Sequence, residues 1–156
     1  MLTYQMPGQK IITIKQVVLD FNGTLACDGE LLPGVAARLQ YLAADTRLYV
    51  LTADTFGTAA RACRDLPVQL SRVDPLNGGE DKERLVIALG AEHTAAVGNG
   101  HNDTQMLARA ALGLLVLGPE GAAGRAVMAA DVVFTGILPA LDFLLKPKRV
   151  VATLRP

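Results

Sequence analysis

The stretch Val17-Val18-Leu19-Asp20-Phe21-Asn22-Gly23-Thr24-Leu25 is the most informative part of this chain. It is an apolar run of strand type that ends on a carboxylate, and the chain then breaks into a Gly-Thr turn. In an open parallel α/β sheet, ligands bind beyond the carboxyl ends of the strands. A carboxylate placed there can act as a nucleophile towards phosphorus. The alternative is that Asp20 only caps a turn or a helix, as Asp often does.

Composition indicates one globular domain over residues 1–156, with 51% hydrophobic and 19% charged residues. The net charge is zero and no basic tract stands out, which argues against a nucleic-acid partner. The chain has no charged leader followed by a long apolar run, and no segment suited to cross a membrane. Cys27 and Cys63 are far apart in the sequence and form no CxxC motif. Two such unpaired cysteines indicate a reducing compartment. We therefore expect a cytoplasmic protein with no nucleic-acid or membrane partner.

Strand-type and helical patterns alternate along the chain, which predicts βαβ units. We expect an α/β, three-layer, Rossmann-like fold with a parallel sheet and helices on both faces. The predicted strands are Lys10–Lys15, Gln16–Phe21, Arg47–Thr52, Val68–Leu70, Thr94–Val97, Leu114–Leu117 and Asp131–Phe134. The predicted helices begin near Pro33 and cover Phe56–Arg64, Glu80–Leu89, Asp103–Ala111, Ala122–Ala130 and Leu138–Leu145. The tail to Pro156 is expected to be loosely held.

The second predicted strand of the sheet also ends on a polar residue, Thr52. A hydroxyl at a strand end, beside the free N–H groups of a helix start, is a natural contact for an anion. The alternative is that Thr52 caps the following helix. Asp54 and Thr55 are interpreted as caps.

Lys82 stands out because the chain has five lysines and this is the one in its whole middle part. It lies in the first turn of a predicted helix, where the helix dipole favours anions. A solvated surface lysine is one interpretation. A lysine directed at a phosphate or at the Asp20 carboxylate explains its placement better.

The segment Gly98-Asn99-Gly100-His101-Asn102-Asp103 follows the next predicted strand directly. Its glycines allow the backbone to bend, and its Asn and Asp side chains offer oxygen ligands to a hard cation such as Mg²⁺. Asp20 and Asp103 together could bind such an ion. The alternative is a turn with a helix N-cap, for which Asn and Asp are also favoured.

These four elements, in this order, resemble the haloacid-dehalogenase-like hydrolase superfamily. The last segment looks most like the hinge motif of P-type ATPases and their small soluble relatives. The resemblance implies that Asp20 is phosphorylated, that Thr52 binds the phosphoryl group and that Lys82 neutralises it. It adds Gly23 and Asn102 to the phosphate-binding residues. It also implies an Mg²⁺ ion held by Asp20, the backbone carbonyl of Asn22, Asn99 and Asp103.

Two residues depart from the pattern of this superfamily. Phosphatases of the superfamily carry a second Asp where this chain has Asn22, and that Asp is the general acid and base. General acid–base help is typically worth about 10²–10⁴-fold in rate, so a slow enzyme is expected. Asn99 stands where the first Asp of the last motif is usual, which removes one negative charge beside the metal.

The chain leaves no room for the cap domain that many members insert. One loop, one helix and one strand fill the segment from Asp20 to Thr52, and similarly little lies between Thr52 and Lys82. Capless members act on large substrates or assemble so that a neighbour covers the site. By analogy with them, a homo-oligomer such as a tetramer is expected.

The sequence thus predicts an Mg²⁺-dependent phosphohydrolase, phosphatase- or ATPase-like, that forms an aspartyl phosphate. Its substrate would be a phosphorylated small molecule or a macromolecular phosphate, either a monoester or an anhydride. The alternative is a non-catalytic module that binds phosphate or Mg²⁺ and acts through a partner surface, which Asn22 and Asn99 favour. Nucleotide binding by a Rossmann-type turn is a weaker alternative, since no GxGxxG follows the first strand.

Overall fold

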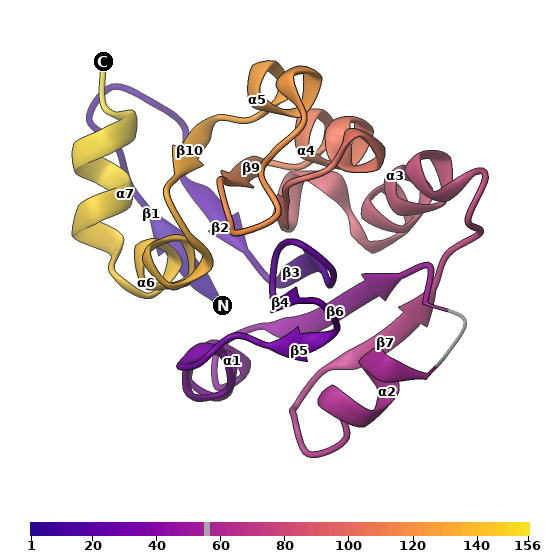
Figure 1. Cartoon of the computed structure of the whole chain (residues 1–156). Helices are drawn as coiled ribbons and strands as arrows, with labels where there is room; N and C mark the ends of the chain where they lie inside the picture. The colour runs from indigo at the N-terminus through magenta and orange to yellow at the C-terminus, as the bar shows by residue number, and fades with distance from the viewer. Residues whose placement is uncertain (55–56) are drawn as a thin grey trace.

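The computed structural model describes residues 1–54 and 57–156. Figure 1 follows the chain through its strands and helices. The strands are β1 (Leu2–Tyr4), β2 (Ile12–Ile14), β3 (Gln16–Asp20), β4 (Ala26–Cys27), β5 (Glu30–Leu31), β6 (Arg47–Thr52), β7 (Gln69–Arg72), β8 (Thr94–Gly98), β9 (Leu112–Val116) and β10 (Val132–Phe134). The helices are α1 (Val35–Ala43), α2 (Thr58–Ala62), α3 (Gly78–Leu89), α4 (Thr104–Arg109), α5 (Gly124–Ala129), α6 (Ile137–Leu145) and α7 (Pro147–Leu154), with 3₁₀ turns η1 (Ala91–His93) and η2 (His101–Asp103).

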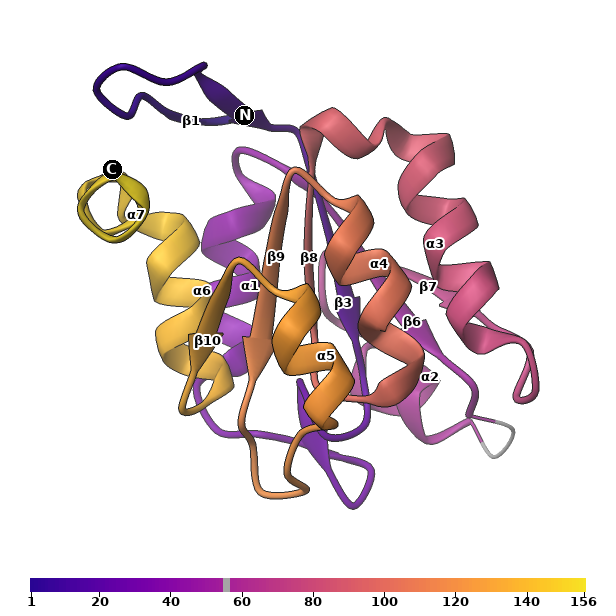
Figure 2. The same cartoon turned by 90° about the horizontal axis from the view of Figure 1, so that it is seen from above.

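The central sheet has the strand order β10-β9-β8-β3-β6-β7, and every neighbouring pair is parallel. Strand β3 lies between β8 and β6, so the ends of these three strands meet at one edge. Helices α3, α4 and α5 cover one face of the sheet, and α1, α2 and α6 cover the other (Figure 2). The expected three-layer α/β fold with a parallel sheet is therefore confirmed.

Successive side chains of the central strands point to opposite faces of the sheet, which explains why helices cover both faces. In β3, the buried side chains of Val17 and Leu19 join the core under α1 and α6, while Val18 joins the core under α3 and α4. Strand β6 alternates in the same way. A strand with apolar residues on both sides is stable only when both faces are packed. The continuous apolar run before Asp20 is thus the sequence signature of a central strand.

Several segments differ from the predictions. The loop expected after Asp20 contains the small antiparallel hairpin β4–β5, whose strands are too short to leave a periodic signal. The tail is not loosely held: it forms α7, in which Val150 is fully buried. The Tyr4 hydroxyl, also buried, donates a hydrogen bond to the Leu144 carbonyl (2.8 Å) just before this helix.

The segment from β3 to β6 contains only the β4–β5 hairpin and α1, and the described part of the segment from β6 to α3 contains only α2 and β7. Neither described segment folds into a domain over the edge of the sheet. The predicted cap residue Thr55 and the predicted helix start Phe56 lie outside the described residues. Within the described ranges, no helix is both long and apolar enough to span a membrane.

Candidate active site

Asp20 is the last residue of β3 and its side chain is largely buried, with 11% exposed. Its two oxygens face different partners. Oδ1 lies 2.6 Å from Lys82 Nζ, and Oδ2 lies 3.2 Å from the Thr24 hydroxyl. Strand β3 places this carboxylate at the carboxyl edge of the sheet, and Lys82 and Thr24 fix the positions of its two oxygens.

A tight turn follows Asp20 and directs the chain away from the sheet. The Phe21 carbonyl accepts hydrogen bonds from the amides of Thr24, Leu25 and Ala26. Gly23 has φ +79°, a conformation that favours glycine. A Cβ atom at Gly23 would collide with the side-chain amide of Asn99, so glycine also lets these two segments approach closely.

Gly23 does not line the cleft beside Asp20, because its amide donates a hydrogen bond to the Ala26 carbonyl (2.8 Å) and its Cα lies against Asn99. This geometry favours a structural role for Gly23 over the phosphate contact expected from the sequence. Asn22, by contrast, is exposed and lines the cleft.

Lys82 is the centre of the site, and it is only 1% exposed. Its Nζ lies 2.6 Å from Asp20 Oδ1 and 2.6 Å from Asp103 Oδ1. A buried lysine between two carboxylates is not a solvated surface residue, so the structure excludes that interpretation. Helix α3 places Lys82 here because its fifth residue points back toward the carboxyl edge of the sheet.

The trio carries two negative charges and one positive charge, and all three side chains are largely buried. Burial and the nearby Asp103 raise the pKa of Asp20 to about 7, although Lys82 and Thr24 act in the opposite direction. Burial would lower the pKa of Lys82, but Asp20 and Asp103 outweigh it and raise that pKa. Lys82 therefore stays protonated, and one carboxylate remains without a full counter-charge.

Asp103 is fully buried and uses both of its oxygens within the protein. Oδ1 accepts from Lys82, and Oδ2 accepts from the amides of Asn99 (3.0 Å) and Gly100 (2.8 Å). It does not line the cleft beside Asp20. This position suits a residue that holds Lys82 and the Asn99–Gly100 loop in place better than it suits the metal ligand expected from the sequence.

Asn99 directly follows β8, and its side chain points toward Asp20, unlike that of Asp103. Its Nδ2 donates to the Gly121 carbonyl (3.0 Å), and its Oδ1 lies 3.2 Å from the Thr24 hydroxyl. Its own carbonyl accepts from the Ala123 amide (2.8 Å). Because a carbonyl can only accept, Gly121 requires the NH₂ end of Asn99, and the oxygen end is left on the side of Asp20.

The residues that converge here fit a magnesium ion. The Thr24 hydroxyl has one proton but lies 3.2 Å from two acceptors, Asp20 Oδ2 and Asn99 Oδ1. Two oxygens that share one donor leave lone pairs that a cation would satisfy. Asn22, whose backbone carbonyl the resemblance adds to the ligands, lines the same cleft. Oxygen ligands of this kind are those that Mg²⁺ prefers, completed by waters and phosphate oxygens.

A cleft of about 230 Å³ opens above these groups. It is lined by Asp20, Asn22, Thr52, Ala53, Lys82, Asn99, Gly100 and Asn102. Thr52 ends β6 beside β3, is 4% exposed, and its Oγ1 accepts a hydrogen bond from the Asp54 amide (3.0 Å). The Asp54 carboxylate accepts from the Ala59 amide in the first turn of α2 (2.8 Å), although Gly57 and not Asp54 occupies the N-cap position of this helix.

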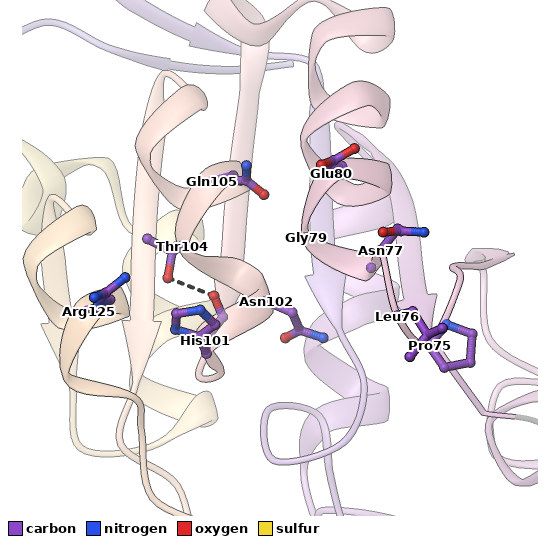
Figure 3. A pocket seen from close by; sticks show the side chains of 11 residues that line it. Pro75, Leu76, Asn77, Gly79, Glu80, His101, Asn102, Thr104, Gln105 and Arg125 are labelled. Atoms are coloured by element: carbon purple, nitrogen blue, oxygen red, sulfur yellow. Dashed lines mark hydrogen bonds between the residues drawn. The ribbon is translucent and has the colours of Figure 1, made fainter.

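A second cleft, of about 410 Å³, adjoins the first and shares Asn102 with it. Figure 3 shows it between the start of α3, with Asn77 and Glu80, and the start of α4, with Gln105. Arg125 reaches its rim from α5 (Figure 3). Its lining combines polar side chains with the apolar Pro75 and Leu76.

The sequence pattern missed three contributors to this site. Thr24 is part of the first motif, but only the structure shows that it joins Asp20 to Asn99. The backbone carbonyl of Gly121 and the amide of Ala123 carry no signal in the sequence, because any residue supplies them. The Gly-rich turn at 118–121 was the available hint.

No family model matches this chain. An uncharacterized protein of Methanocaldococcus jannaschii is 45% identical over 60 residues, which cover 38% of this chain and 64% of that protein. A second uncharacterized protein of the same organism is 46% identical over 39 residues, 25% of this chain and 89% of that protein. The chain thus spans less than two thirds of the first relative.

Several solved structures share the fold of this chain. The cobalt-bound deoxy-D-mannose-octulosonate 8-phosphate phosphatase of Haemophilus influenzae has a TM-score of 0.72 at 18% identity, over 92% of this chain and 94% of that one. The 3-deoxy-D-manno-octulosonate 8-phosphate phosphatase of Moraxella catarrhalis, solved with a magnesium ion, a phosphate ion and a KDO molecule, has a TM-score of 0.71 at 18% identity, over 91% of this chain and 94% of that one. A zinc-transporting PIB-type ATPase matches at 25% identity with a TM-score of 0.64, over 78% of this chain and 20% of the pump. A Legionella pneumophila protein assigned to the HAD superfamily of hydrolases also matches, with a TM-score of 0.69 at 15% identity, over 90% of this chain and 86% of that one. This chain therefore has the haloacid-dehalogenase-like fold, with no cap domain in its described residues.

Proposed function

We propose that this chain is an Mg²⁺-dependent phosphohydrolase in which Asp20 forms an aspartyl phosphate. The observation that carries the proposal is the buried contact of Lys82 with Asp20 and Asp103, both at 2.6 Å. A scaffold gains little from three buried charges, because desolvation can cost more than the ion pairs return. Charges kept at such a cost are typical of functional sites.

In the first step, a carboxylate oxygen of Asp20 attacks phosphorus in line. A bond forms between this oxygen and phosphorus, and the bond from phosphorus to the leaving group breaks with its electron pair. Lys82 and Thr52, which line the same cleft, stabilise the charge on the equatorial oxygens. Such fixed electrostatic stabilisation is most of what phosphoryl transfer requires.

Asp103 is a positioning residue in this proposal. It holds Lys82 from the side opposite Asp20 and binds two amides of the loop after β8. Asp20, Asn99 and the Asn22 carbonyl would hold the magnesium ion. When bound, the ion supplies positive charge that lowers the cost of bringing a phosphate next to a carboxylate.

In the second step, water attacks phosphorus and the bond to the Asp20 oxygen breaks. This step is expected to be slow, because the exposed Asn22 cannot take the proton of the water or give one to the leaving group. Among the described residues, the cleft contains no other carboxylate than Asp20. The missing acid and base are worth about 10²–10⁴-fold, so the phosphoenzyme is expected to accumulate.

The rival function is a non-catalytic module that binds phosphate or Mg²⁺ on the same scaffold. Asn22 and Asn99 support it, since both replace carboxylates that catalysis would use. An assembly of several copies, a tetramer by analogy, would cover the open cleft in either case. We also propose that the protein is cytoplasmic and that its substrate is a phosphorylated small molecule or a macromolecular phosphate.

Hydrolysis of para-nitrophenyl phosphate, with and without Mg²⁺, tests the proposal in the wild type, Asp20→Asn and Asn22→Asp. We expect slow magnesium-dependent turnover that Asp20→Asn abolishes and Asn22→Asp raises by at least tenfold. Asp65→Asn is the matched control, since Asp65 is exposed and remote in sequence from the motifs. Activity that survives in Asp20→Asn would refute the mechanism, and silence in all variants would support the binding module.

A further inference from the structure

The residues that would hold the metal ion carry little negative charge. Asp103 is turned away, with both oxygens used by Lys82 and two amides. Among the residues that the structure describes, Asp20 is the one carboxylate that lines the cleft, and its Oδ1 is already paired with Lys82. Asn99 contributes a neutral oxygen. Metal affinity in oxygen sites rises with the number of charged ligands, so this set binds a divalent ion weakly by itself.

Asn99 is nevertheless held firmly in a ligand's orientation. Its amide lies against Gly23, its Nδ2 is bound to the Gly121 carbonyl, and its backbone accepts from Ala123. Its Oδ1 therefore stays beside Asp20 Oδ2, across the Thr24 hydroxyl. The site has the geometry for a metal ion but lacks one charge.

A phosphoryl group supplies the missing charge. A phosphate or its mimic on Asp20 brings negative oxygens to the same space, and Mg²⁺ commonly binds through one or two carboxylates plus substrate phosphates. We propose, on the basis of the proposed function, that the metal ion and the phosphoryl group bind this site cooperatively, because Asn99 is a neutral ligand. Each then raises the affinity of the other by the same factor.

The test is calorimetric titration of the chelator-treated protein with Mg²⁺, alone and in the presence of beryllofluoride, at one pH and ionic strength. For the wild type we expect beryllofluoride to strengthen Mg²⁺ binding by about 5–150-fold, the usual range for coupled sites. Asn99→Asp adds the missing charge, so Mg²⁺ alone should bind more tightly and the coupling factor should fall at least about fivefold.

Gln105→Glu is the matched control, because it makes the same change of amide to carboxylate on α4, in the neighbouring cleft. It should leave the coupling factor close to that of the wild type. Asn99→Asp also loses the donor to Gly121, so its folding is checked by circular dichroism. The wild-type titration stands even where that variant fails to fold.

The outcomes separate this inference from the proposed function. Beryllofluoride that binds without any change in Mg²⁺ affinity overturns the cooperative pair and leaves the aspartate mechanism intact. Equal coupling factors in the wild type and a folded Asn99→Asp variant also overturn it, since the charge of residue 99 would then be irrelevant. A protein that takes up no beryllofluoride at any Mg²⁺ concentration refutes the aspartyl-phosphate function, and the inference with it.

Discussion

Replacing the nucleophile should stabilise the metal-free fold. The buried trio of Asp20, Lys82 and Asp103 has one negative charge in excess. Asp20→Asn would leave a balanced pair of Lys82 and Asp103. The amide of this variant could also donate to Asn99 Oδ1 or Thr24, where two acceptors now share one proton. Active sites often hold such unfavourable arrangements at a cost in stability.

The magnitude and its pH dependence follow from the pKa of Asp20, which rises from 3.8 in the unfolded chain to about 7 in the fold. A rise of this size corresponds to about 4 kcal/mol. Because the folded pKa is the higher one, this contribution to stability is complete below about pH 4 and is lost as the pH rises to about 7. The Asp20→Asn variant has no carboxyl group to ionise at this position, so it does not lose this stability as the pH rises.

We therefore expect Asp20→Asn to gain little at pH 4 and about 1–4 kcal/mol at pH 8, the lower values allowing for its weaker hydrogen bond to Lys82. Urea unfolding followed by circular dichroism, with chelator present, measures this difference. The exposed Asp65→Asn should change stability by no more than about 0.5 kcal/mol at either pH. An Asp20→Asn protein no more stable than the wild type at pH 8 would refute the reasoning.

Three other perturbations test the contacts around and outside the site. Lys82→Met leaves two buried carboxylates without a cation and should cost about 3–5 kcal/mol in urea unfolding at pH 7; an unchanged midpoint would contradict the buried trio. Gly23→Ala combines φ +79° with a collision against Asn99, so its Tm should fall by an amount equivalent to about 1–3 kcal/mol, and a wild-type Tm would disprove the close approach. Arg38 binds both oxygens of Asp142 (2.8 and 3.0 Å) and thereby lowers the pKa of that carboxyl. The pair joins α1 to α6, and its small contribution to stability should be present above about pH 4 and be lost as the pH falls through the lowered pKa of Asp142. In urea unfolding, Arg38→Gln should therefore be less stable than the wild type at pH 7, and the difference should shrink as the pH is lowered; a difference independent of pH would contradict the ion pair.

Much of the fold could be predicted because its signals are local. The apolar run before Asp20 predicted a central strand, and β3 indeed lies between β6 and β8. Thr52 and the Gly98–Asp103 segment were placed correctly at the same edge, since the carboxyl ends of parallel strands meet there. The β4–β5 hairpin and α7 are not predicted from the sequence. The hairpin has strands of only two residues, and α7 begins at Pro147, a residue that also ends helices.

The sequence by itself determined which chemical groups this protein brings to the edge of its sheet, because strand and helix periodicities are written in neighbouring residues. Tertiary structure alone decided how those groups face one another. Asp103 turned inward to Lys82, whereas Asn99 turned toward Asp20 because Gly121, 22 residues later in the chain, accepts its NH₂ group. These two contacts join residues that are 21 and 22 positions apart in the chain, so no local pattern encodes them.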